Sequence, residues 1–172
     1  MELKRSNLIL IPLTDLSCCS TVGAIFGYMG GHSQNAALMF KNEAAIQKTA
    51  ASNQWNYYQA KSSKQNLAEL SVTLTQGEAR QKFEQAIDRY KQEKEEIKAE
   101  AEKLEAASKV AEDKSAAEMH VHERWALATT LLQIAIALSA VTLLTRKRWL
   151  LGAVYGSTAL GLVTGVLGYL HL

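Results

Sequence analysis

Two long apolar runs near the carboxyl end constrain this chain more than any other feature. The first extends from Trp125 to Thr145 and the second from Trp149 to Leu170, with Arg146, Lys147 and Arg148 between them. Each run has about 21 residues, which at roughly 1.5 Å per helical residue is enough to cross a ~30 Å hydrocarbon core. We therefore expect two transmembrane helices joined by a very short loop.

The cations of this loop predict an orientation, because short loops rich in Lys and Arg stay on the cytoplasmic side of a membrane. A third apolar stretch, from Leu8 to Tyr28, follows Lys4 and Arg5. If this stretch also crosses, every short-loop cation lies on the cytoplasmic side. We therefore predict three transmembrane helices, with the amino terminus in the cytoplasm and both the central segment and the carboxyl terminus outside.

The central segment carries nearly all of the charge but has no net excess of either sign. Between Lys41 and Arg124 there are 14 Lys and Arg residues against 15 Asp and Glu residues. A basic face for nucleic acid is therefore not expected. The only proline is Pro12, and Gly77 is the only glycine between Gly31 and Gly152. So few helix breakers, with many Ala, Glu, Lys and Gln residues, predict an all-α chain.

The central segment divides at Gln76-Gly77 into two helices with apolar residues at alternating steps of three and four, as in a coiled coil. We predict an antiparallel coiled-coil hairpin in residues 32–124, with its turn near residues 76–77, between membrane segments in residues 1–31 and 125–172. The predicted seam contains Ile46, Ala50, Asn53, Tyr57, Ala60, Lys64, Leu67, Ser71 and Leu74, then Phe83, Ile87, Tyr90, Lys94, Ile97, Ala101, Leu104, Ser108 and Ala111. Ser, Lys, Asn and Ala make this seam weak, so further chains are expected to associate with it, as a homo-oligomer or within a larger membrane complex.

Four stretches of the chain are distinctive as a set, namely Asn42-Glu43-Ala44-Ala45-Ile46, Gln54-Trp55-Asn56-Tyr57-Tyr58-Gln59-Ala60-Lys61-Ser62, Tyr90-Lys91-Gln92-Glu93-Lys94-Glu95-Glu96-Ile97 and Leu132-Gln133-Ile134-Ala135-Ile136-Ala137-Leu138. In this order they resemble the domain-of-unknown-function family 4337. The first span departs from the family, which usually has a smooth aliphatic helix where this chain has Pro12 and Asp15. The resemblance implies a bacterial membrane protein with a helical arm, hence a location in the inner membrane, and it implies no activity.

Asp15 is the most unusual residue, because it lies inside the first apolar stretch. An ionised carboxylate at such depth costs at least ~2.5–3.5 kcal/mol, so it should be neutral, paired or near water. Ser139 and Ser157 lie at similar depth in the other spans, with Gln133 farther out. The functional interpretation is an ion or proton site, or a docking point for a cation. The structural interpretation is a protonated carboxyl hydrogen-bonded within the bundle.

The histidines form a second candidate site. His32 follows the first stretch, His120 and His122 precede the second, and His171 is near the carboxyl end, so the predicted topology places all four at the outer face. Imidazole suits copper and zinc. Residues two apart on a helix point about 200° from each other, so His32 with either His120 or His122 is the more credible pair. Amphipathic histidines at a membrane interface are the alternative.

Glycines at steps of four predict helix packing, because small residues let backbones approach closely in lipid. One set lies on the first stretch and two pairs lie on the last. Whether these faces meet another span or another copy of the chain stays open. The residues are Gly23, Gly27 and Gly31, Gly152 with Gly156, and Gly161 with Gly165.

Trp55 and Tyr58 lie off the predicted seam and face either a partner or the second helix. No glycine-rich phosphate loop is present in the sequence, and no Ser, His and Asp order suggests hydrolysis. We therefore expect a non-enzymatic accessory subunit or scaffold, without a cofactor. The alternatives are a copper- or zinc-binding accessory protein using His32, and an ion or proton transport component using Asp15.

Overall fold

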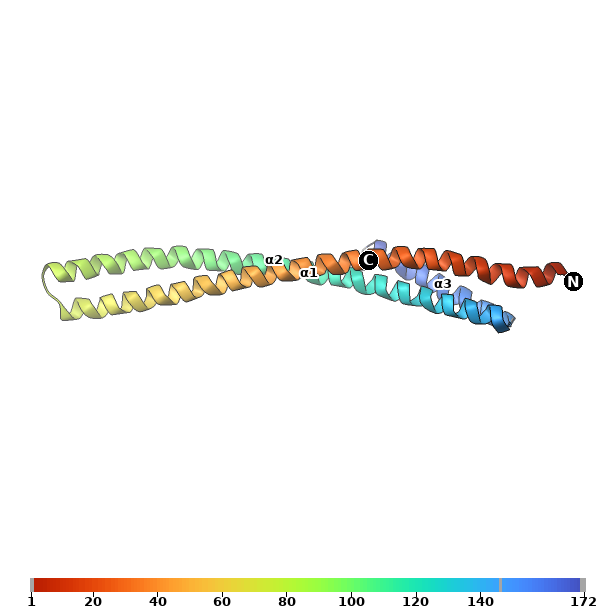
Figure 1. Cartoon of the computed structure of the whole chain (residues 1–172). Coiled ribbons are helices and arrows are strands. Elements are labelled where there is room, and N and C mark those ends of the chain that lie inside the picture. Colours follow the sequence, from red (N-terminus) through yellow and green to blue (C-terminus); the bar gives the residue numbers. More distant parts are fainter. Residues whose placement is uncertain (1, 146, 171–172) are drawn as a thin grey trace. The chain divides into compact units, whose positions relative to one another are not determined.

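The computed structural model describes residues 2–145 and 147–170, with side chains for residues 13–145, 147 and 149–170. Every regular element in these ranges is helical, as the composition predicts. The predicted roles of Arg146 and His171 therefore fall outside the described residues. The three helices are α1 (Glu2–Leu74), α2 (Glu78–Thr145) and α3 (Arg148–Tyr169) (Figure 1).

Two helices contain a stretch long and apolar enough to cross a membrane, namely α2 and residues Trp149–Tyr169 of α3. Among the described residues of α1, no stretch is apolar enough. The prediction of three transmembrane helices is therefore wrong, and two candidate spans replace it. The physical reason lies between Leu13 and Tyr28, where Asp15 and several Ser, Thr and Gly residues interrupt the apolar side chains.

The chain forms two compact units, which we describe separately. Unit 1 contains residues Met1–Leu38 and Ser115–Leu172, and unit 2 contains Met39–Lys114. In unit 1, parts of all three helices pack together around Cys19, Leu132 and Ala135. The rings of Phe26 on α1 and Trp125 on α2 extend this core, with centroids 5.1 Å apart.

Glycines contribute to unit 1 at some of the predicted positions. A Cβ at Gly23 or Gly161 would meet Leu132, and one at Gly165 would meet the Phe26 ring. Gly30, which the step-of-four pattern missed, lies so close to α2 that an added Cβ would be 3.1 Å from the Trp125 Cβ. Nothing in the chain lies within 4 Å of a Cβ built at Gly27, Gly31, Gly152 or Gly156.

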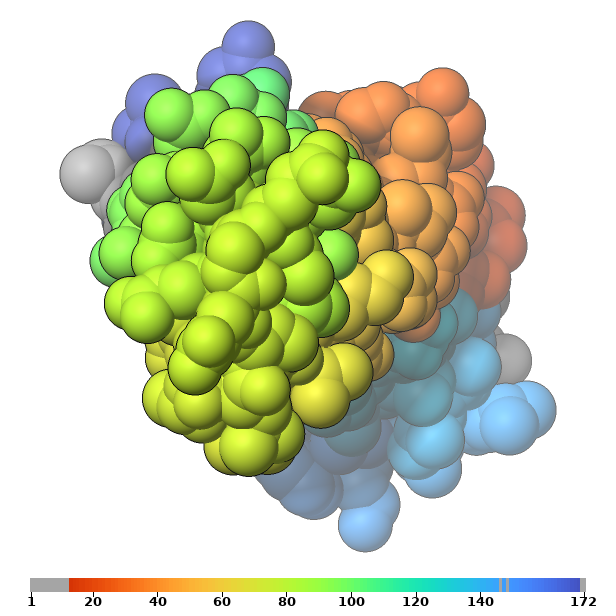
Figure 2. All heavy atoms as spheres, turned by 90° about the vertical axis from the view of Figure 1, so that its left-hand side faces the viewer, coloured from red at the N-terminus to blue at the C-terminus, as the bar shows by residue number. Residues whose placement is uncertain are grey.

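In unit 2, α1 and α2 run antiparallel, with later residues of α1 contacting earlier residues of α2 (Figure 1). The chain reverses after Leu74 through a turn in which Gly77 has φ +65°, a left-handed conformation that favours glycine. Gln81 N–H donates to the Gly77 carbonyl at 3.3 Å and continues the backbone hydrogen bonding at the start of α2. Figure 2 shows the end of unit 2 at this turn, with atoms of both helices packed together.

The buried face between the two helices consists mostly of alanine. Ala44, Ala51 and Ala68 are buried on α1, and Ile97, Ala101 and Ala111 are buried on α2. Alanine removes little apolar surface from water, but its small size lets the two backbones approach closely. The helices of unit 2 are therefore held by close contact more than by large apolar side chains.

The predicted seam is right on α2 and wrong on α1. Each predicted α2 position, from Phe83 to Ala111, is buried or half-buried. On α1, Ile46, Tyr57, Leu67 and Leu74 are instead 67%, 50%, 64% and 77% exposed. The buried stripe lies one residue further along, which is a rotation of about 100° around the helix axis. The prediction for α1 followed the large side chains. In the structure the two helices approach so closely that the stripe with the small side chains faces α2 instead.

Replacing Gly30 with Leu is expected to destabilise unit 1, because the new side chain must push α1 away from Trp125. Overpacking of this kind costs about 1–3 kcal/mol. The matched control is Gly31→Leu, since space is open at the neighbouring position. Thermal unfolding of the full chain in detergent, followed by circular dichroism, should show a lower midpoint for Gly30→Leu only. Equal midpoints for the two variants would show that the contact does not limit packing.

Candidate functional sites

The first candidate site is a polar cluster within unit 1. Asp15 is half-buried, and its carboxyl group is within interaction range of the Tyr155 hydroxyl on α3. Among the described residues, Asp15 Oδ2 and Ser139 Oγ are the two buried side-chain polar atoms without a hydrogen-bond partner. A buried polar group without a partner costs about 1–3 kcal/mol. Such a cost inside a bundle makes this cluster a candidate for function.

The helix register explains how Asp15 and Ser139 come to the same level. Asp15 precedes Cys19 by four residues on α1, and Ser139 follows Ala135 by four residues on α2. Cys19 and Ala135 belong to one packed cluster. Because the two helices run antiparallel, both steps of four move in the same direction along the bundle. Asp15 and Ser139 therefore lie at the same level of the bundle, about one helical turn beyond the contact of Cys19 with Ala135.

The other predicted polar residues are not buried without a partner. The Ser157 hydroxyl donates to the Val154 carbonyl at 3.1 Å within its own helix, and Gln133 is exposed. Sequence reasoning did not identify Tyr155 or Thr158, whose hydroxyl lies 3.5 Å from Cys19 Sγ. Tyr155 and Thr158 are three residues apart and so lie on one face of α3, and this spacing could have identified them from the sequence.

The three described histidines point to different partners. The side chain of His32 is exposed and lines a cavity of about 470 Å³ in unit 1 with Glu118, Trp125 and Tyr169. The ring of His122 is 2.8 Å from the Gly30 carbonyl through Nδ1, so Nδ1 carries the proton and donates. His120 Nδ1 lies 3.3 Å from Glu123 Oε2 on an exposed surface, so these contacts do not join one histidine to another.

This arrangement does not assemble a metal centre from one copy of the chain. Within the described ranges, no three His, Cys, Asp or Glu residues come together as a group that could hold a metal ion. Of the described residues that line the cavity, two are of these types, His32 and Glu118. A bound zinc or copper ion requires three or four protein ligands, so the metal alternative gains no support from this geometry.

The second candidate site is a groove of about 530 Å³ in unit 2, between α1 and α2. Trp55 lines the groove, and its indole Nε1 donates to Glu105 Oε1 at 2.9 Å. The Trp55 and Tyr58 rings meet edge to face, with centroids 5.7 Å apart. The groove therefore has one aromatic wall and, because Lys109 and Glu112 also line it, charged residues of both signs.

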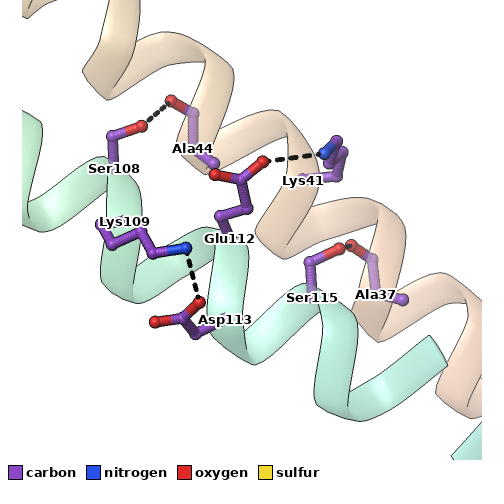
Figure 3. A network of polar contacts seen from close by, with 8 residues as sticks. All are labelled: Ala37, Lys41, Ala44, Ser108, Lys109, Glu112, Asp113 and Ser115. Carbon is purple, nitrogen blue, oxygen red and sulfur yellow. Dashed lines mark hydrogen bonds and ion pairs between the residues drawn. The ribbon is translucent and has the colours of Figure 1, made fainter. Parts of the chain in front are cut away.

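Polar contacts lock the two helices beside this groove (Figure 3). The Ser108 hydroxyl is buried and donates to the Ala44 carbonyl at 2.9 Å. On the outside, Lys41 of α1 pairs with Glu112 of α2 at 3.4 Å, and Lys109 pairs with Asp113 at 3.1 Å within α2 itself. The groove is thus built on a rigid wall, because the buried serine ties α2 to the backbone of α1.

Closer to the turn, an ion pair lies between the helices. The Lys61 ammonium is 2.5 Å from Glu93, and only 14% of the Lys61 side chain is exposed. The hydrogen bond to Glu93 raises the pKa of Lys61, and the same bond lowers the pKa of Glu93. The Lys61 ammonium also lies 5.1 Å from the centre of the Tyr57 ring. Neighbouring Tyr58 is half-buried, and the Lys94 ammonium lies 4.9 Å from the centre of its ring.

Comparison with known proteins adds a family and no activity. One family model matches residues 16–171, which is most of the chain; the match includes Ser139 and Trp55 and begins one residue after Asp15. No curated protein and no solved structure matches the chain. The functional argument therefore depends on the geometry of the chain itself.

The ion pair predicts how the stability of the chain depends on pH. Glu93 has a lowered pKa, so its contribution is present above its ordinary value of ~4.3 and is lost as the pH falls. Lys61 has a raised pKa, so its contribution is present below ~10.4 and is lost as the pH rises. The difference in unfolding midpoint between the native chain and Lys61→Met should therefore be largest between about pH 5 and 10 and should narrow toward pH 3.

The control for this measurement is Lys103→Met. Lys103 pairs with Glu100 at 3.3 Å, but 75% of its side chain is exposed, and such surface pairs contribute little to stability. Its unfolding midpoint should stay close to that of the native chain at each pH. A Lys61→Met difference that does not change with pH would show that the ion pair does not stabilise unit 2.

Proposed function

The chain belongs to the family described as domain of unknown function DUF4337, and we propose that it is a membrane-anchored, non-enzymatic scaffold or accessory subunit of a bacterial membrane complex. Its unit 1 would anchor the chain, and its unit 2 would hold a helical hairpin in the aqueous phase for partners to bind. The observation that carries this proposal is the exposure of the two apolar stretches.

Apolar stretches of this length also occur as core helices in soluble proteins, where they are mostly buried. Here only 28% of the apolar stretch of α2 and 22% of that of α3 is buried within the chain. Exposed large side chains along them include Leu127, Leu144, Leu160 and Val163. Monomeric soluble proteins rarely expose apolar patches larger than a few hundred Å². A bilayer covers such surfaces without further protein.

The orientation follows from the loop cations. Arg146, Lys147 and Arg148 separate the two candidate spans and favour the cytoplasmic side. With the loop in the cytoplasm, α2 would cross the inner membrane inward and α3 would cross it outward. Residues 39–114, which precede the span of α2, would then lie on the extracytoplasmic side of a multi-pass protein. In that compartment, the antiparallel coiled coil of unit 2 would present its groove and its charged α2 surface to other proteins.

One observation favours a second function, the transport of protons or ions. The unpartnered Asp15 Oδ2 and Ser139 Oγ lie within the same unit as both candidate spans. An ionisable residue inside a membrane bundle is a functional-site hypothesis by default. However, a single carboxyl group without a second charge beside it is a poor relay. We therefore rank transport below the scaffold role.

The scaffold proposal predicts a stoichiometric partner. Purification of the tagged full chain from native membranes in gentle detergent, with mass spectrometry of the eluate, should yield one. Trp55→Ala should reduce the partner yield at least tenfold, because Trp55 forms the aromatic wall of the groove. The control is Val110→Ala, an exposed apolar residue on α2 outside the groove. A chain that elutes without any other protein would contradict the accessory role.

The orientation of the chain in the membrane is tested in cells that express the full chain with Cys18 and Cys19 replaced by Ala. A membrane-impermeant maleimide should label Lys103→Cys in intact spheroplasts and Lys147→Cys only after permeabilisation. Labelling of Lys147→Cys in intact spheroplasts would reverse the topology.

The transport alternative has its own test. If the chain is a scaffold, proteoliposomes of the native chain and of Asp15→Asn should show the same proton leak as empty vesicles, measured with an internal pH-sensitive dye. A proton flux in the native chain that disappears in Asp15→Asn, and persists in Gln133→Leu, would establish transport through Asp15.

A further inference from the structure

The outward face of α1 in unit 2 is unpartnered and regular. Large exposed side chains recur at steps of seven residues, at Met39, Ile46, Leu67 and Leu74. The two positions that complete the series, Asn53 and Ala60, are exposed as well. A repeat of seven is the period at which a stripe faces a neighbouring helix in a coiled coil. We call these six residues the outer stripe.

Charge is almost excluded from this side of the hairpin. Between Met39 and Leu74, α1 has six charged residues, whereas α2 has twenty between Glu78 and Lys114. Four of the six, Lys41, Lys48, Lys61 and Glu69, lie toward the buried side of α1, whereas the exposed Glu43 and Lys64 lie three residues before Ile46 and Leu67, about 60° from the outer stripe. The other positions that flank the stripe are mainly Asn, Ser, Thr and Gln. The stripe itself carries no charge over some ten turns and has only these two charges, of opposite sign, beside it, whereas a solvated helical face normally has more.

A second copy of this chain fits the outer stripe better than a different partner. If a different protein with a strongly charged surface bound here, its charges would find few opposite charges on the outer stripe of α1. Two faces with so few charges meet with little like-charge repulsion, and a two-fold interface uses the same patch on both copies. The large apolar side chains of this face, with Tyr57 and Leu70, offer roughly 600 Å² per copy at about 100 Å² each. With the amide and hydroxyl groups between them, this approaches the ~800 Å² per partner of a stable interface.

We propose that two copies of the chain dimerise through the outer stripe of α1, as parallel helices in register, with Asn53 facing Asn53 of the second copy. The parallel direction depends on the proposed membrane anchoring, because two copies in one membrane point the same way. A single Asn within an otherwise apolar stripe selects register and oligomeric state, since an unmatched buried amide is unfavourable. The highly charged α2 helices then remain on the outside of the dimer.

Disulfide formation between single cysteines tests this arrangement in the full chain in native membranes, with Cys18 and Cys19 replaced by Ala. A parallel dimer in register brings each stripe residue next to the same residue of the second chain. The distance between the two Cβ atoms is then close to the ~4 Å that a disulfide needs. Both Ile46→Cys and Leu67→Cys should therefore cross-link to themselves under mild oxidation. Val110→Cys is the matched control, because Val110 is an exposed apolar residue on α2 and should not cross-link.

Other patterns of cross-linking would overturn the proposal. If Ile46→Cys joins only to Leu67→Cys when the two variants are co-expressed, the helices associate antiparallel. If Leu67→Cys joins instead to a different protein, the outer stripe binds a heterologous partner. If neither variant cross-links, the stripe is not an interface between copies of the chain.

Substitutions that change association provide a second measurement. Leu67→Lys should lower the dimer fraction in nanodiscs at least tenfold, by mass photometry, whereas Val110→Lys should leave it unchanged. Asn53→Ile should keep association but allow species larger than a dimer to appear, because the amide that restricts the oligomeric state is gone. Association that is insensitive to both Leu67→Lys and Asn53→Ile would overturn the interface.

The two proposals fail in different ways. A native chain that stays in the membrane fraction but is monomeric would overturn the dimer and leave the anchoring intact. A chain that dimerises through Leu67 but is released from membranes by alkaline carbonate would overturn the anchoring alone.

Discussion

Small residues let α1 and α2 approach so closely that side chains of α2 reach the backbone of α1. The donors and the acceptors recur at steps of seven residues on their respective helices. In each bond a buried or half-buried donor on α2 meets a backbone carbonyl of α1, and such a bond is worth about 0.5–1.5 kcal/mol. Two of the pairs are Ser108 with Ala44 at 2.9 Å and Ser115 with Ala37 at 2.8 Å (Figure 3). The third is His122 with Gly30 at 2.8 Å.

Close approach at small residues has a consequence for the large ones. In unit 2 the buried face of α1 uses Ala44 and Ala51, so Ile46 and Leu67 remain on the surface. Burial of alanine contributes far less than burial of leucine, at about 25 cal/mol per Å² of apolar surface. The hairpin therefore depends on polar contacts such as Lys61 with Glu93, and it retains apolar surface for association. Unit 1 behaves similarly, because its apolar stretches are mostly exposed and suited to lipid.

The candidate sites show how far sequence reasoning reaches. An acidic residue within an apolar stretch identified Asp15, and helical depth identified Ser139, and these two residues have the unpartnered buried atoms. The same reasoning missed Tyr155, because depth along a helix does not say which face of that helix meets the cluster. It left open whether Tyr58 faces a partner or the second helix, and the structure places the Tyr58 ring beneath the Lys94 ammonium of α2.

The sequence by itself determined the helical character of the chain, the reversal at Gly77 and the two apolar stretches of α2 and α3. These features depend on local properties, namely the scarcity of breakers, one residue suited to a left-handed turn, and continuous hydropathy. Only the tertiary structure decided which stripe of α1 meets α2. Stripes on both faces of α1 repeat every seven residues, so periodicity cannot choose between them. The choice requires small residues and hydrogen-bond donors to match on two helices at once, and this matching exists only when the helices pack.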